Sequence, residues 1–369
     1  MIRNIEMVDL KSQYNEIKDR IDDSILEVIS NCEFINGSKV KEFASALSNW
    51  NKTKHTIPCA NGTDGLQIAL MALGLEPDDE VIVPAFTYIA TVEVISLLKL
   101  KPIFVDVYPD TFNMKVESIH NVISDRTKVI MPVHLYGQCS EMDEINKIAE
   151  EHKLFVIEDL AQAIGSEYKG TKVGNLGNIG VTSFFPSKNL GCYGDGGALL
   201  TNDDELAGKI KMIANHGQSE KYIHDIIGVN SRLDTVQAAI LIEKLKELNR
   251  YIENRQGAAN VYDNLLTGID EITIPHRSSN STHVFHQYTI KVVQRRDDLK
   301  KFLQAKGIPS MIYYPLTIPQ QSAYSHLTNK SFIESESLVN QVLSLPMHTH
   351  LSKEDQIFIC DSIKSFFHA

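Results

Sequence analysis

The first half of the chain alternates short apolar runs with segments in which apolar residues recur every three or four positions. Several of the runs are rich in Val and Ile and are bounded by Pro, Gly or Asp, as buried parallel strands are. These expected strands cover Thr56–Cys59, Glu80–Val83, Pro102–Val105, Lys128–Val133, Leu154–Ile157, Gly180–Phe185 and Ala198–Thr201. The expected helices between them cover Gly65–Leu73, Ile89–Leu98, Val116–Ile123 and Glu141–Glu151. This alternation predicts an α/β fold with a mostly parallel sheet and helices on both of its faces.

The pattern changes after Asp203, where longer helical segments surround one alternating strand. The helices expected here cover Asp203–Ala214, Asp234–Leu266, Asp297–Lys306 and Lys353–Phe367, and the strand covers His286–Val293. The second of these helices is long, and we expect it to bend near Asn249–Tyr251. We therefore expect a large α/β domain over residues 1–245 and a smaller α+β domain over residues 246–369.

Composition and charge narrow the class of protein. The chain has 369 residues, a net charge of −11 and no run of lysines and arginines, which argues against a nucleic-acid partner. No apolar stretch reaches the roughly 18–20 residues needed to cross a membrane, and the N-terminal segment lacks the apolar core of a signal peptide. Five scattered cysteines without a C-x-x-C pair are typical of a reducing compartment. We therefore expect a cytoplasmic protein whose ligands are small molecules.

A glycine-containing turn follows the first expected strand. Asn61-Gly62-Thr63-Asp64-Gly65 leads into an apolar helix. Ligands of open α/β sheets bind beyond the C-terminal ends of the strands, and a helix N-terminus offers free N–H groups to an anion. The segment also fits an ordinary tight turn in which Thr63 or Asp64 caps the helix.

Two further strand ends carry an acid and a lysine. Asp159 follows Leu154–Ile157, and Lys188 follows Gly180–Phe185 and precedes a glycine-rich turn. A buried carboxylate needs a partner, although Asp159 could instead cap a helix. A desolvated lysine can form a Schiff base, although most single lysines lie along the surface. Together with an anion-binding helix N-terminus, these groups form the set that pyridoxal 5'-phosphate (PLP) requires.

The sequence resembles the DegT family of sugar-nucleotide aminotransferases over nearly its whole length. The resemblance rests on CANGTDGLQIAL (Cys59–Leu70), PAFTYIAT (Pro84–Thr91), EDLAQAIG (Glu158–Gly165), SFFPSKNLGCYGDGGAL (Ser183–Leu199), HGQ (His216–Gln218) and GVNSRLDTVQAAIL (Gly228–Leu241). It implies the fold-type I architecture of PLP-dependent transferases, PLP as cofactor, and a homodimer whose subunits share their active sites.

The resemblance also implies roles for particular residues. Lys188 would form the Schiff base and then move the proton between substrate and cofactor, and Asp159 would pair with the pyridine nitrogen. The remaining cofactor contacts would come from Gln162 near the ring hydroxyl, Tyr88 on the ring face, Gly62, Thr63 and Ser183 at the phosphate, and Asn230 reaching the phosphate from the partner subunit.

Within the family, the motifs look most like the branch that aminates C3 of UDP-2-acetamido-2-deoxy-3-oxo-D-glucuronate, with L-glutamate as donor, for surface polysaccharides such as lipopolysaccharide O-antigen. Arg232 is the candidate for the sugar carboxylate across the dimer interface, or equally a structural ion pair or helix cap. Tyr313-Tyr314 stands where relatives usually have His-Tyr, in a loop expected to approach the sugar.

Other readings stay open. The substrate could be a dTDP- or GDP-linked keto-deoxysugar, or the chain could be a non-catalytic regulator, which would be expected to lose Lys188 or Asp159. A sugar dehydratase of this fold would usually replace the lysine with histidine, and a nicotinamide dehydrogenase would need a glycine fingerprint that is missing. His283-x-x-His286 and His348-x-His350 have metal-like spacing without cysteine or carboxylate neighbours, so we expect no metal.

Overall fold

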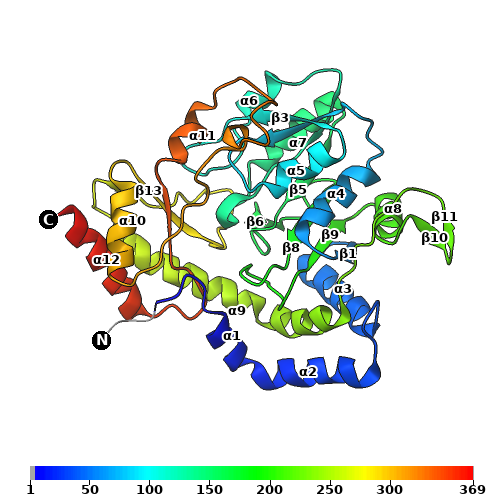
Figure 1. Ribbon diagram of the computed structural model, residues 1–369, viewed down its shortest axis with the longest axis horizontal. Helices are drawn as coiled ribbons and strands as arrows, with labels where there is room; N and C mark the ends of the chain where they lie inside the picture. Colours follow the sequence, from blue (N-terminus) through cyan, green and yellow to red (C-terminus); the bar gives the residue numbers. More distant parts are fainter. Residues whose placement is uncertain (1–4, 369) are drawn as a thin grey trace.

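The computed structural model describes residues 5–368; the first four residues, which open the segment considered above for a signal peptide, and Ala369 lie outside this range. Within it, the central sheet has seven strands in the order β1-β9-β8-β5-β4-β2-β3 (Figure 1). The strands are β1 (His55–Cys59), β2 (Glu80–Pro84), β3 (Lys101–Val105), β4 (Thr127–Ile130), β5 (Phe155–Asp159), β8 (Ile179–Ser183) and β9 (Gly197–Thr201). Only β9 runs antiparallel to its neighbours, so the mostly parallel α/β sheet is confirmed.

Helices cover both faces of this sheet. Side chains along a strand alternate between faces, and β2 accordingly sends Ile82 into one apolar cluster and Val81 and Val83 into the other. The first cluster includes α3 (Ser38–Asn51), α7 (Met142–His152) and the start of α9 (Thr235–Leu266). The second includes α4 (Gly62–Ala72), α5 (Ala90–Leu97) and α8 (Asp204–Ala214).

The long helix α9 joins the two halves of the molecule across the lower half of Figure 1, above α1 and α2 in that view. It is helical without interruption through the position of the expected bend. Leu241 and Leu245 belong to the core beneath the sheet, whereas Ala259 and Tyr262 pack into a C-terminal core. That second core includes β13 (Tyr288–Val292), β14 (Val342–Leu345), α10 (Arg296–Ala305) and α12 (Lys353–Phe367). Residue 245 therefore lies inside a helix that contributes to both cores.

Several smaller elements complete the described chain. They are α1 (Leu10–Glu16), α2 (Lys18–Asn31), α6 (Glu117–His120), α11 (Ile333–Leu338), η1 (Leu135–Gly137), η2 (Ile318–Gln320), the hairpins β6 (Glu167–Tyr168) with β7 (Thr171–Lys172) and β10 (Gln218–Glu220) with β11 (Ile223–His224), and β12 (Ile272–Thr273). The helix expected over Val116–Ile123 is one turn long, because the chain turns at Ser124–Thr127 to enter β4. None of the helices in residues 5–368 is long and apolar enough to span a membrane.

Candidate active site

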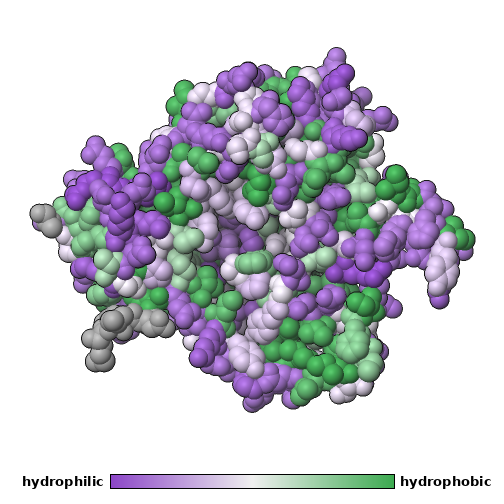
Figure 2. Space-filling model, in the orientation of Figure 1, coloured by the Kyte–Doolittle hydropathy of each residue, from purple (hydrophilic) through white to green (hydrophobic). Residues whose placement is uncertain are grey.

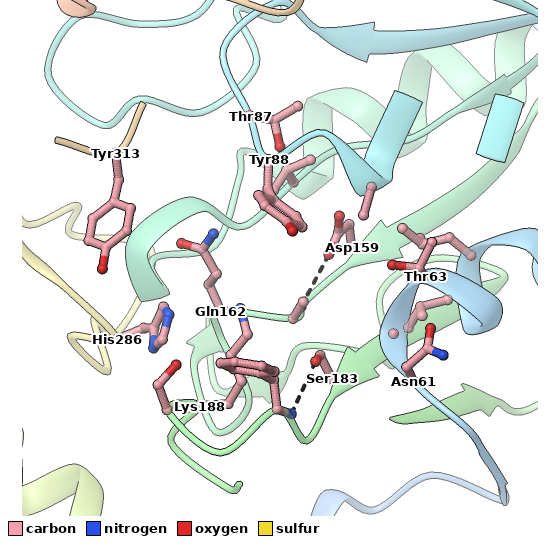
Figure 3. Close-up of a pocket in the computed structure, with 18 of the residues that line it drawn as sticks. Asn61, Thr63, Thr87, Tyr88, Asp159, Gln162, Ser183, Lys188, His286 and Tyr313 are labelled. Carbon is pink, nitrogen blue, oxygen red and sulfur yellow. Dashed lines mark hydrogen bonds between the residues drawn. The ribbon is translucent and has the colours of Figure 1, made fainter. Parts of the chain in front are cut away.

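A cavity of about 660 Å³ lies where β5 and β8 end and the C-terminal half of the chain packs against them. Figure 2 shows it as the hollow near the centre of the molecule. Residues from both halves of the chain line it, and Figure 3 shows many of them in close-up. Of the expected site residues, those lining the cavity are Gly62, Thr63, Tyr88, Asp159, Gln162, Ser183, Lys188, Tyr313 and Tyr314.

The N-terminus of α4 forms one end of the cavity. Asn61, not Thr63 or Asp64, is the N-cap, because its Oδ1 accepts the Asp64 N–H at 2.8 Å. A Cβ on Gly62 would lie 2.8 Å from the Cβ of Ser183, so glycine is what lets α4 begin directly against β8. The first N–H groups of the helix lack intrahelical acceptors, and with the Ser183 hydroxyl beside them they suit a phosphate.

Asp159 lies at the end of β5, in the floor of the cavity. Its side chain is buried, which raises the pKa of the carboxyl. The Thr91 hydroxyl donates to Oδ2 at 2.9 Å and the Ala161 N–H donates to Oδ1 at 3.2 Å, and both hydrogen bonds lower that pKa. Asp159 therefore does not cap a helix; it presents a doubly anchored carboxylate to the cavity.

The neighbouring acid, Glu158, points to the other face of the strand. It accepts the N–H groups of Gly174, Leu176 and Gly177 at 2.7–2.8 Å and contacts His134 at 3.1 Å. None of these partners lines the cavity. Glu158 therefore fastens a loop to the sheet, while strand alternation leaves Asp159 for the site.

Lys188 extends into the cavity rather than along the surface (Figure 3). Burial lowers the pKa of its amine to about 8, against the opposing effect of the Asp159 charge. Among the described residues it is the one Lys or Arg side chain that lines the cavity. A lysine in this setting is readily deprotonated, as a Schiff-base lysine must be.

Another side of the cavity is lined by Gln162 and three tyrosines, Tyr88, Tyr313 and Tyr314. Gln162 accepts the Tyr136 N–H at 2.9 Å and donates to the Tyr314 hydroxyl at 3.0 Å. Tyr136 donates its own hydroxyl to the Tyr313 carbonyl, which ties this loop to the large half of the molecule. Tyr88 is 54% exposed, and its ring centroid lies 6.0 Å from that of Tyr314. Tyr88 is thus an open aromatic wall at the mouth of the site.

Sequence analysis missed His286 as a site residue and considered it only for a metal. It lines the cavity, and burial, with Lys188 and Arg255 nearby, holds its pKa well below the usual value. Its partner in the spacing, His283, instead accepts the Phe285 N–H at 3.0 Å. In the described part of the chain, no group of three or more His, Cys, Asp and Glu is placed to hold a metal. The sequence signal that could have identified His286 as a site residue was its position just before β13.

Asn230 and Arg232 do not line this cavity in the single chain. Asn230 forms a backbone bridge with Asn215, and Arg232 donates from Nη2 to the Asn215 side chain at 3.4 Å. The Nε of Arg232 is buried without a hydrogen-bond partner in residues 5–368. Their roles across a subunit interface stay predictions.

Comparison with known proteins agrees with this geometry. The model of the DegT/DnrJ/EryC1/StrS aminotransferase family matches residues 15–364. A UDP-2-acetamido-2-deoxy-3-oxo-D-glucuronate aminotransferase from Pseudomonas aeruginosa is 45% identical over 97% of this chain and 99% of its own. A protein named pleiotropic regulatory protein from Geobacillus stearothermophilus is 44% identical over 99% of both chains. A crystal structure of a DegT DnrJ EryC1 StrS aminotransferase from Brucella abortus superimposes with a TM-score of 0.95, at 42% identity over 98% of this chain and 99% of that one.

The fold and the cavity together define a PLP-dependent transferase. The chain belongs to the DegT/DnrJ/EryC1/StrS aminotransferase family. One similar structure, ntda from Bacillus subtilis with the bound cofactor PMP, has a TM-score of 0.89 and 33% identity over 95% of this chain and 82% of that one. The cavity here fits such a cofactor, because it combines a helix N-terminus, a buried carboxylate and a lysine whose side chain has no hydrogen-bond partner in the described residues.

Proposed function

We propose that this protein transfers the amino group of L-glutamate to the keto carbon, C3, of UDP-2-acetamido-2-deoxy-3-oxo-D-glucuronate. The observation that carries the proposal is the placement of Lys188 and Asp159 in one cavity, in a chain 45% identical to an aminotransferase of that name. A relative from Acidithiobacillus ferrooxidans, named UDP-N-acetyl-3-dehydro-alpha-D-glucosamine 3-aminotransferase, is 42% identical and supports amination at C3. The product would serve surface polysaccharide synthesis, such as that of O-antigen.

Seven residues that line the cavity have proposed tasks in this reaction. Bound PLP carries the amino group between the two substrates and withdraws electrons from the reacting carbon. Lys188 would carry the proton between the substrate carbon and the cofactor carbon, which requires the neutral amine. Asp159 pairs with the ring nitrogen, and Gly62, Thr63 and Ser183 hold the phosphate. Gln162 stands near the ring hydroxyl, and Tyr88 covers the open face of the ring.

The test follows the nitrogen atom. The purified holoenzyme is incubated with L-[¹⁵N]glutamate and the keto-sugar, and mass spectrometry detects ¹⁵N in the amino sugar. The reverse reaction, from the stable 3-amino sugar and 2-oxoglutarate, gives an independent readout. Transfer to dTDP- or GDP-linked keto-deoxysugars, without transfer to the UDP-sugar, would overturn the substrate and keep the reaction class.

The regulatory name of one relative favours a second candidate, a non-catalytic regulator on this scaffold. The intact lysine and acid in the cavity argue for catalysis instead. The absorbance spectrum separates the two. An aminotransferase shows an absorbance band of bound PLP that L-glutamate bleaches, whereas a regulator without the donor half-reaction shows no bleaching.

We further propose a homodimer in the cytoplasm in which each subunit completes the partner's site. A diphosphate sugar needs cations, and the lining of the cavity in residues 5–368 supplies only Lys188. Arg232 is the candidate cation from the partner. Exposed apolar side chains that could bury in such an interface are Leu26, Ile29, Phe34 and Ile35, near α2, and Tyr222, Ile223, Ile226 and Ile227, at the protruding β10–β11 hairpin (Figures 1 and 2).

Subunit mixing tests the shared site. Lys188→Ala and Arg232→Ala chains are each inactive as homodimers, and they are unfolded and refolded together. If Arg232 acts across the interface, mixed dimers contain one complete site and recover about a quarter of wild-type activity. No recovery, in a mixture shown to contain mixed dimers, would place Arg232 in its own subunit's site. An active Arg232→Ala homodimer would place it outside catalysis.

A further inference from the structure

Asp159 depends on a side chain that does not line the cavity. Thr91, in the first turn of α5, is fully buried, and its hydroxyl is the only side-chain group in the described residues that donates a hydrogen bond to the Asp159 carboxylate. The other donor is the backbone N–H of Ala161. One oxygen is thus held by a main-chain group that no substitution removes, and the other by a hydroxyl that a single substitution can remove.

The Thr91 hydroxyl has a second neighbour that fixes its direction. The Thr87 hydroxyl lies 3.2 Å away, one helical turn earlier, and Thr87 is itself buried and lines the cavity. A hydroxyl carries one proton, and the Asp159 carboxylate can only accept. Thr91 therefore donates to Asp159 and accepts from Thr87, so the three side chains form a directed chain that ends on Asp159 Oδ2.

We propose that Thr91 is a positioning residue for the cofactor: its hydroxyl holds the Asp159 carboxylate charged and aimed at the ring nitrogen of PLP. The inference rests on the PLP-dependent function proposed above. Because Thr91 does not line the cavity, it acts only through Asp159.

The electrostatics of the floor give the direction of the effect. Burial raises the pKa of Asp159, and the Thr91 hydrogen bond is the largest effect that lowers it. Without that hydroxyl, the pKa of Asp159 rises further and its charge is less stabilised. A neutral carboxyl cannot form an ion pair with a protonated ring nitrogen, and a rotated carboxylate is no longer aimed at that atom. The loss therefore falls on the ring nitrogen and not on the phosphate or the aldehyde.

Two cofactors and two variants isolate the effect of the Thr91 hydroxyl on the pairing of Asp159 with the ring nitrogen. Cofactor-free wild-type, Thr91→Val and Thr91→Ser proteins are titrated with PLP and with 1-deaza-PLP, which carries C–H in place of the ring nitrogen. Valine keeps the shape and removes the hydroxyl, whereas serine keeps the hydroxyl. We expect Thr91→Val to weaken PLP binding about tenfold and Thr91→Ser about twofold or less, with 1-deaza-PLP binding unchanged in both.

A spectroscopic readout is independent of turnover. The ¹⁵N resonance of PLP labelled at the ring nitrogen reports protonation of that atom in the holoenzyme. We expect the wild-type and Thr91→Ser resonances in the protonated range and the Thr91→Val resonance shifted toward the neutral form. If Thr91→Val fails to fold by circular dichroism, Thr91→Ala and Thr87→Val take its place, the second with a smaller shift because it removes only the donor to Thr91.

The outcomes separate this inference from the proposed function. Equal weakening of PLP and 1-deaza-PLP binding by Thr91→Val would make Thr91 merely structural and overturn the inference, as would an unshifted ¹⁵N resonance. If wild-type protein binds PLP no better than 1-deaza-PLP, Asp159 is not the partner of the ring nitrogen, and the inference falls at that point. Failure to aminate the keto-sugar, with the binding pattern intact, would overturn the proposed substrate alone.

Discussion

Two lysines, the half-buried Lys188 and the fully buried Lys244, invite comparison because desolvation lowers the pKa of each to about 8. Lys188 lies in the cavity with Asp159 close enough to oppose the shift. Lys244 lies on α9, has no exposed surface, and its Nζ has no hydrogen-bond partner in the described residues. The Tyr193 ring centroid lies 5.0 Å from Nζ, and Cys192 and Arg255 are close enough to affect its pKa. A lowered lysine pKa thus occurs once in the candidate active site, at Lys188, and once in the protein core, at Lys244.

The difference shows what identifies a functional lysine. A depressed pKa by itself selects both residues. Access to a cavity, an acid across that cavity and a helix N-terminus at its end select only Lys188. Lys244 lines none of the cavities described here, so no space for a substrate adjoins its amine. Geometry, not the shifted pKa, carries the assignment.

The largest expected effect is on activity, where the two lysines should differ. Lys188→Met removes the amine that moves the proton, and we expect turnover to fall by about a thousandfold or more. The matched control, Lys244→Met, removes an equally perturbed amine from the core, and we expect activity within about twofold of wild type. The measurement is ¹⁵N transfer from glutamate under saturating substrates. A comparable loss in both variants would show that the two lysines cannot be told apart by their surroundings.

The second expected effect is on stability, where substitution of either lysine should have the same result. A folded-state pKa of about 8 against an ordinary value of 10.5 means that each folded lysine resists protonation that the unfolded chain accepts. Either Met variant should therefore stabilise the cofactor-free protein by on the order of 3 kcal/mol at pH 7. The gain is complete below pH 8, shrinks between pH 8 and 10.5, and vanishes above that range.

Urea denaturation at pH 7 and pH 10.5 measures this effect. A gain in Lys244→Met alone would mean that Lys188 is solvated through the cavity. A gain in neither would mean that both amines find partners in solution. If catalysis needs Lys188 but not Lys244, as proposed, only Lys188 lowers stability in return for a function.

Much of this architecture is predictable from sequence. Val- and Ile-rich runs bounded by Pro, Gly or Asp gave the strands of the sheet within a few residues, because burial on both faces demands apolar side chains at every position. The strand-end positions of Asp159 and Lys188 then placed both in one cavity. These features follow from local pattern and from the topology of parallel strands.

The parts that escaped prediction depend on contacts between distant segments. Lys244 sits in a helical pattern that gives no sign of its burial, because Tyr193, which covers it, is far away in sequence. His286 was weighed only through its spacing from His283, whereas its position comes from packing of the C-terminal half on the sheet. Asn61 was passed over as N-cap for Thr63 and Asp64, because the helix begins at Gly62, three residues before the expected start at Gly65.

The smallest expected effect concerns the charge of the Asp159 carboxylate, which acts on Lys188 and has no counterpart at Lys244. Asp159 raises the pKa of Lys188 against burial, and no carboxylate has this role at Lys244. Acylation of the cofactor-free protein, followed by mass spectrometry from pH 6 to 10, should show Lys188 reacting with a midpoint near pH 8, while Lys244 stays unmodified. In Asp159→Asn the charge is gone and burial acts alone, so the midpoint should move downward by less than about one pH unit. An upward shift would mean that the amide stabilises the charged amine better than the carboxylate does, and an unchanged midpoint would mean that solvent screens the pair completely.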